Sequence, residues 1–200
     1  SGLEFDCAGS ICAHSLGPYA TPNIDGEFDI DDFVLSKIKL GHVRGPIHYG
    51  QLVIKLPRTI GEQGRSRYRF EQGKVDFRGG IRLEGIANVE PLSIPDAVAM
   101  FGMTGAAENV EGFATKGRAE VAFTSRRNRW NVDVETALAG IEYDGLRLGD
   151  GEVTVHYDTG DIDIEHLILN RDGAQVDLAG RVGKEGALDT NTILSSFRLD

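Results

Sequence analysis

The amino-acid sequence predicts a mainly β protein, an antiparallel β-meander with one short helix. Apolar and polar residues alternate along many short stretches, as side chains do on the two faces of a strand. Short turns carrying Gly, Asp or Asn join most of these stretches. Only one segment has the apolar spacing of a helix. The alternating stretches are Glu27–Ile30, Gln51–Leu56, Lys74–Gly79, Ile81–Glu84, Arg118–Phe123, Trp130–Glu135, Gly151–Tyr157, Asp161–Glu165 and Gln175–Leu178.

The clearest hairpin is "GEVTVHYDTGDIDIEHLILN", which begins at Gly151. Val153, Val155 and Tyr157 share one face of its first strand. Ile162 and Ile164 continue that face after a turn at residues 158–160. The apolar face therefore needs a cover, which is either an ordinary protein core or something other than protein.

The single short helix is predicted within residues 92–105, "LSIPDAVAMFGMTG". Ser93 is a suitable N-cap, Pro95 suits the first turn, and the glycines at 102 and 105 are stop signals. The helix separates a β segment over residues 1–91 from a second β segment over residues 106–200. We interpret the three parts as one continuous repetitive unit and expect it to be a piece of a longer chain.

The chain also resembles itself at a distance of 108 residues. "IKLGHVRGPIHYG", which begins at Ile38, aligns with "LRLGDGEVTVHYDTG", which begins at Leu146, so that His48-Tyr49 falls on His156-Tyr157. Such self-similarity is typical of repeat architectures, in which each unit stacks on the next. The alternative is that two unrelated meanders align this well by chance.

Composition limits the function classes. The chain has 200 residues, 21 of them basic and 31 acidic, which gives a net charge of −10. Nucleic acid is a poor partner for such a chain, because phosphate binding needs a basic footprint. No apolar run approaches the roughly 20 residues of a membrane-spanning helix.

Two cysteines lie close together in the segment "DCAGSICA". A tight hairpin there would let Cys7 and Cys12 form a disulfide, which suits an oxidising compartment. The alternative is two small buried residues in one strand.

Motifs of known enzyme classes are missing from the sequence: it has no GxSxG elbow, P-loop, HExxH or strand-following GxGxxG. We predict a protein without enzymatic activity, metal or cofactor. His48 and His156 fall on polar strand faces, which favours solvated side chains over metal ligation. The row Asp161, Asp163, Glu165 and the segment 23–32 are weak calcium candidates, since solvated outer faces explain them equally well.

Two basic clusters interrupt the acidic composition. Arg65, Arg67 and Arg69 alternate with Ser66, Tyr68 and Phe70, which predicts a strand with one cationic and one mostly aromatic face. Arg126, Arg127 and Arg129 lie in a second cluster, "SRRNRW". Arginines of this kind bind anionic headgroups or single strands of nucleic acid in some proteins. More often they protect a strand edge or solubilise a loop, and that interpretation is preferred here.

The order of elements from Leu92 to Val182 resembles the repeated unit of the AsmA-like family, in particular its TamB (translocation and assembly module) branch. The resemblance is carried by the short helix, by "YDGLRLG", by "LIL" at residues 167–169 and by "DGAQVDLAG" at residues 172–180. Residues 24–85 match less well, and the cysteine pair and the basic segment at residues 61–69 depart from the pattern.

This resemblance implies a taco-shaped open β-groove with an apolar lumen. It implies a segment of a periplasm-spanning protein of the cell envelope, anchored to the inner membrane by a segment outside this chain. Such a protein conducts phospholipid between the inner and outer membranes or supports outer-membrane assembly. The implied partners are phospholipid acyl chains and, through the full-length chain, inner- and outer-membrane proteins.

The resemblance also implies that the apolar strand faces bind lipid. The predicted lipid-binding residues are the apolar members of the C-terminal strands: Val132, Val134, Val153, Val155, Ile162, Ile164, Val176 and Leu178. A closed β-sandwich or solenoid that binds carbohydrate or protein would use the same strands, as would an enzyme with a site assembled from scattered residues. Alternation alone does not separate these readings.

Overall fold

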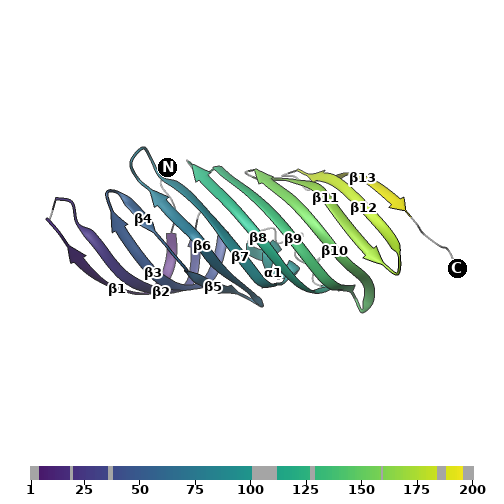
Figure 1. Ribbon diagram of the computed structural model, residues 1–200, viewed down its shortest axis with the longest axis horizontal. Helices are drawn as coiled ribbons and strands as arrows, with labels where there is room; N and C mark the ends of the chain where they lie inside the picture. Colours follow the sequence, from purple (N-terminus) through teal and green to yellow (C-terminus); the bar gives the residue numbers. More distant parts are fainter. Residues whose placement is uncertain are drawn as a thin grey trace.

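The computed structural model describes residues 5–18, 20–35, 38–100, 112–126, 129–158, 160–183 and 188–195. Within this part of the chain, thirteen strands form one antiparallel sheet, and one short helix accompanies it (Figure 1). The prediction of a mainly β meander with a single helix is confirmed.

Most of the chain is extended. The elements are β1 (Phe5–Leu16), β2 (Asn23–Leu35), β3 (Ile38–Gly50), β4 (Val53–Lys55), β5 (Ile60–Gln63), β6 (Ser66–Asp76), β7 (Arg82–Leu92), α1 (Ile94–Met100), β8 (Phe113–Arg126), β9 (Arg129–Tyr143), β10 (Leu146–Asp158), β11 (Asp161–Arg171), β12 (Ala174–Val182) and β13 (Leu188–Ser195).

Successive strands are neighbours in the sheet. The order is β1-β2-β3-β4-β6 and then β7 to β13 in sequence, and the short strand β5 also lies between β3 and β6. Figure 1 shows the strands following one another along the long axis of the molecule. Two turn edges result. The β3–β4, β6–β7 and β8–β9 turns share one edge, and the β5–β6, β9–β10 and β11–β12 turns share the other.

The helix α1 begins at Ile94, as the sequence predicts, and the predicted stops at residues 102 and 105 lie outside the described residues. The backbone carbonyl of Ser93 accepts a hydrogen bond from the Ala97 amide at 2.9 Å. The Ser93 hydroxyl has no hydrogen-bond partner among the described residues, so its side chain does not act as the predicted cap. Instead, the Arg65 amide donates to the Asp96 carboxylate at 2.6 Å and joins α1 to the β5–β6 turn.

The predicted internal repeat has a structural counterpart in one pair of hairpins. Strands β3 and β10 have equal length and are offset by 108 residues, and their partners β2 and β9 keep the same register. His48 pairs with Asp25 at 2.5 Å in the first hairpin, and His156 pairs with Asp133 at 2.6 Å in the second. The sequence similarity therefore coincides with a shared cross-strand arrangement, and the repeat itself stays a prediction.

The N-terminal half of the sheet is closed. Leu35, at the end of β2, packs with Leu83 of β7 and with Trp130 and Val132 of β9. In the order of the sheet, β2 lies four strands from β7 and six strands from β9, so the β2–β3 hairpin folds back across the apolar face. A second cluster around Phe28 and Phe70 fills the space beneath it. We refer to this apolar side as the inner face and to the opposite side as the outer face.

The strand β6 shows how alternation sets these faces. Tyr68 and Phe70 are buried in the core, whereas Arg67 and Arg69 are exposed on the other side. Arg67 forms an ion pair with Glu62 at 3.4 Å. The prediction of one cationic and one aromatic face is confirmed for this strand.

The predicted disulfide is wrong. Cys7 and Cys12 lie on the single strand β1 rather than on two arms of a hairpin. Five residues of extended chain separate their Cα atoms by about 16 Å, and a disulfide requires less than about 7 Å. The Cys12 thiol is free and exposed, and the side chain of Cys7 lies outside the described residues.

Candidate ligand-binding face

The register of β9 to β12 places all eight predicted residues on the inner face. Val134 of β9 lies opposite Val155 of β10, and Val155 lies opposite Ile164 of β11. The remaining residues occupy positions of the same parity on their strands, because side chains alternate between the faces. The sequence therefore predicted this face, although contact with lipid stays a prediction.

The eight residues differ in how far protein covers them. Val132 is only 2% exposed and packs against Leu35, Leu83 and Trp130. The expectation that Val132 lines an open groove is therefore wrong, because the folded-back β2–β3 hairpin brings Leu35 onto it. Val134 and Val153 are half-buried at the margins of the buried clusters.

The open part of the face begins at Val155. Six half-exposed aliphatic residues of β10, β11 and β12 take no part in the buried clusters. We call them the apolar lining: Val155, Ile162, Ile164, Leu167, Val176 and Leu178. In the described part of the chain, β11 and β12 make substantial contacts only with neighbouring strands. The sheet is a single layer there.

Sequence reasoning missed Leu167, and with it Leu169. The pairing of β10 with β11 shifts by one residue between Thr154 and Val155, so β11 contains a bulge. A bulge adds one residue and moves the following side chains to the other face. The signal was present in the sequence, because three positions separate Ile164 from Leu167 where strict alternation requires two.

The outer face of the same strands is polar and internally paired. Arg181 of β12 contacts the carboxylates of Asp161 and Asp163 at 3.5 and 3.4 Å. These carboxylates, which were weak calcium candidates, are thus bound to a guanidinium group. The Asp133 carboxylate accepts a hydrogen bond from the His156 imidazole and thereby raises the pKa of His156 above its ordinary value.

A second group of metal-ligating side chains lies on the outer face of β2 and β3. Ligand atoms of Asp29, Asp31 and His42 all lie within 4.8 Å of one another. Both carboxylates are exposed, and the His42 imidazole contacts Asp29 at 2.6 Å. The group lies on open surface without a buried ligand, so we assign no metal to it.

A cavity of about 540 Å³ lies away from the apolar lining. Lys55, Lys74, Glu84 and Asp133 contribute to its walls. Lys74 and Glu84 alternate with the buried Leu83 and its partner Val75, which places them on the outer face. The cavity is therefore distinct from the face that the sequence predicted.

Comparison with family models, curated proteins and solved structures finds no match to this chain. Within the described residues, no helix has the length and apolar character needed to cross a membrane.

Proposed function

We propose that this chain binds lipid through the apolar lining, as a non-enzymatic segment of a protein that conducts phospholipid or supports outer-membrane assembly. The supporting observation is that β11 and β12 form a single layer whose inner face is aliphatic and lacks a protein cover in the described part of the chain. An uncovered apolar surface favours a partner that removes it from water.

The chemistry of the lining favours an acyl chain over a sugar. Its six residues have aliphatic side chains, which offer neither hydrogen-bond donors nor acceptors. Pockets for polar ligands include a few precisely placed polar groups. The aromatic residues Phe123 and Trp130 lie 6.3 Å apart inside the closed half, where Trp130 is buried. The lining therefore suits a ligand recognised by its apolar surface alone.

The cellular setting is part of the same proposal. A lipid carrier of this kind would work in the periplasm, held to the inner membrane by a segment outside this chain. Its partners would be membrane proteins reached through the full-length protein. The resemblance to the AsmA-like family motivates this setting.

A matched pair of substitutions on β12 tests the proposal. Leu178 points to the inner face, and Ala179 follows it on the outer face. Leu178→Asp should abolish the lipid that native mass spectrometry detects on the purified chain, because a carboxylate in an acyl-lined surface loses its hydration. Ala179→Asp adds the same charge to the same strand and should leave lipid loading unchanged.

Circular dichroism and thermal melting would establish that both variants remain folded. Equal lipid loading of the two variants would contradict the proposal. So would a wild-type chain that takes up no phospholipid or fatty acid after delipidation and incubation with vesicles.

A further inference from the structure

One turn edge of the sheet carries a row of arginines. Arg82 at the start of β7 lies directly opposite Arg126 at the end of β8, and Arg126 lies opposite Arg129 at the start of β9. All three are exposed, and their shared register places them on the outer face. Like charges directly opposite each other in a sheet are destabilising. The row is therefore unfavourable without a counter-charge.

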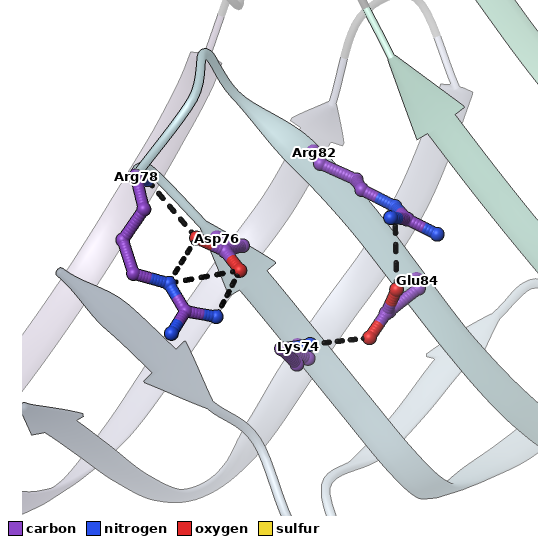
Figure 2. Close-up of polar contacts among 5 residues, drawn as sticks. All are labelled: Lys74, Asp76, Arg78, Arg82 and Glu84. Atoms are coloured by element: carbon purple, nitrogen blue, oxygen red, sulfur yellow. Dashed lines mark hydrogen bonds and ion pairs between the residues drawn. The ribbon is translucent and has the colours of Figure 1, made fainter. Parts of the chain in front are cut away.

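The neighbouring charges compensate only part of this row. Figure 2 shows Arg78 folded back onto Asp76, with contacts down to 2.5 Å that hold the pKa of this carboxyl below its ordinary value. Glu84 is shared between Lys74 at 2.5 Å and Arg82 at 3.3 Å (Figure 2).

The other two arginines of the row, Arg126 and Arg129, differ from Arg82 in their charge partners. Within the described part of the chain, neither Arg126 nor Arg129 forms an ion pair. These two side chains, with Lys74, Arg78 and Arg82, are five basic groups. The nearby carboxylates of the described residues are three: Asp76, Glu84 and Asp158, which ends β10 beside Arg129. The edge is thus locally cationic in a chain whose net charge is −10.

An exposed leucine lies beside this row. Leu52 is 52% exposed, and its carbonyl accepts a hydrogen bond from the Phe77 amide at 2.9 Å, next to Arg78. Leu52 and Gln51 have φ values of 61° and 53°. Residues other than glycine, asparagine and aspartate rarely adopt this conformation. The turn thus presents an apolar side chain to water in a backbone geometry that costs free energy.

We propose that this edge, formed by Leu52, Arg78, Arg82, Arg126 and Arg129, docks onto an anionic lipid bilayer. Arginines bind the phosphates of anionic lipids, and an adjacent leucine inserts at the boundary between headgroups and acyl chains. The bilayer supplies the counter-charge that the row lacks and the apolar environment that Leu52 lacks. The β3–β4, β6–β7 and β8–β9 turns lie at this same edge of the sheet. The edge is separate from the apolar lining, so this inference goes beyond the proposed function.

Vesicle flotation tests the inference with the whole chain. Wild-type protein should float with vesicles of phosphatidylglycerol and phosphatidylcholine, and should not float with phosphatidylcholine alone. Binding should weaken as NaCl is raised from about 0.1 to about 1 M, because the Debye length falls from about 10 to about 3 Å. The double variant Arg126→Gln/Arg129→Gln should lose about fivefold in partitioning per arginine, on the order of 25-fold in total.

Leu52→Gly separates docking from stability. Glycine accepts a positive φ, so the variant should melt no lower than wild type. Its vesicle binding should nevertheless fall about tenfold, because the inserted side chain is lost. A merely structural role for Leu52 would leave vesicle binding unchanged.

Matched controls come from the opposite turn edge. Leu146 is 58% exposed and Arg147 is exposed, both next to the β9–β10 turn. Leu146→Gly and Arg147→Gln should float as wild type does. Equal losses in these controls would overturn the proposal, as would equal binding to neutral vesicles. Binding of a single-stranded oligonucleotide through the same arginines, without vesicle binding, would also overturn it. A chain that ignores vesicles but still takes up delipidated acyl chains would refute docking while leaving the apolar lining intact.

Discussion

The closed and open halves of the sheet consist of the same kind of alternating strand, but their inner faces are buried to different extents. In the closed half, Leu83 and Val132 are 4% and 2% exposed, because the β2–β3 hairpin folds back over them. In the open half, Ile164 and Leu178 stand on the same inner face and remain half-exposed. Alternation decides which face is apolar, whereas a cover that comes from strands distant in the sheet decides whether that face is a core.

The repeated hairpins sharpen this difference. The β2–β3 and β9–β10 hairpins share their register and a histidine–aspartate pair. Yet the end of β2 reaches across the sheet to Trp130, whereas Val155 of the second hairpin joins no buried cluster of the described residues. Hairpins with the same local structure thus have different positions: the first covers the inner face, and the second carries part of the uncovered inner face.

The largest difference in stability between the closed and open halves is expected when an aspartate is introduced on the inner face of each. Val132→Asp places a carboxylate inside a sealed cluster, where burial without a partner costs several kcal/mol. We expect this variant to be unfolded or strongly destabilised in urea titration. Ile164→Asp keeps part of its hydration on the open face and should lose about 1 kcal/mol of unfolding free energy.

Each of these two variants has an uncharged control of the same shape. Val132→Asn and Ile164→Asn change the polarity without adding a charge, and should rank in the same order with smaller losses. Equal destabilisation by Val132→Asp and Ile164→Asp would mean that the lining is a conventional core, covered by parts of the chain outside the described residues.

Truncation of leucines should show the same asymmetry at a smaller scale. Leu83→Ala removes a side chain from the buried cluster and should cost about 3 kcal/mol, since the surrounding core relaxes only partly. Leu167→Ala removes a half-exposed side chain and should cost about 1 kcal/mol. Chemical denaturation of the delipidated protein measures both values. Comparable losses would show that Leu167 packs as tightly as Leu83.

Much of the fold could be predicted from sequence, because strand faces depend on local alternation. The strands around Val153 and Tyr68 and the helix at Ile94 follow from patterns within a few residues. The site was predicted in part: five of the eight residues belong to the apolar lining, Val134 and Val153 lie at the margins of the buried clusters, and Val132 is sealed. Its cover is Leu35, about a hundred positions earlier in the chain, and no local pattern encodes that contact. The disulfide failed for the related reason that "DCAGSICA" contains no turn in the structure.

Alkaline pH should affect the closed half first. Burial raises the pKa of Tyr68 well above the ordinary tyrosine value, and its hydroxyl donates to the Leu40 carbonyl. The folded state keeps Tyr68 neutral while the unfolded chain ionises above about pH 10. The stabilising contribution is therefore complete below pH 10 and is lost as the pH rises further. Urea midpoints measured from pH 8 to 11 should fall steeply for wild type.

Two phenylalanine variants test which tyrosine causes the loss of stability at alkaline pH. Tyr68→Phe should reduce the fall of the urea midpoint between pH 8 and 11, which we call the alkaline limb. At neutral pH it should cost about 1 kcal/mol of unfolding free energy for the lost hydrogen bond. Tyr157 is half-buried at the boundary of the closed half, and burial raises its pKa too. Tyr157→Phe should flatten the limb less. An alkaline limb unchanged by Tyr68→Phe would place the titration elsewhere.

The smallest effect is expected at the outer face where the two halves meet. The hydrogen bond that His156 donates to Asp133 is the main cause of the raised pKa of His156, and the charges of Asp163 and Asp158 add to it. A raised histidine pKa stabilises the fold fully below about pH 6.5, and this contribution disappears as the pH rises through the folded-state value. Both side chains are partly exposed, so solvent screening keeps the change in stability small.

NMR titration should show the His156 pKa falling in Asp133→Asn, whereas Asp25→Asn, at the equivalent position of the other hairpin, should leave it unchanged. A His156 pKa that is insensitive to Asp133→Asn would mean that Asp133 lies beside His156 on a solvated face without stabilising the protonated imidazole.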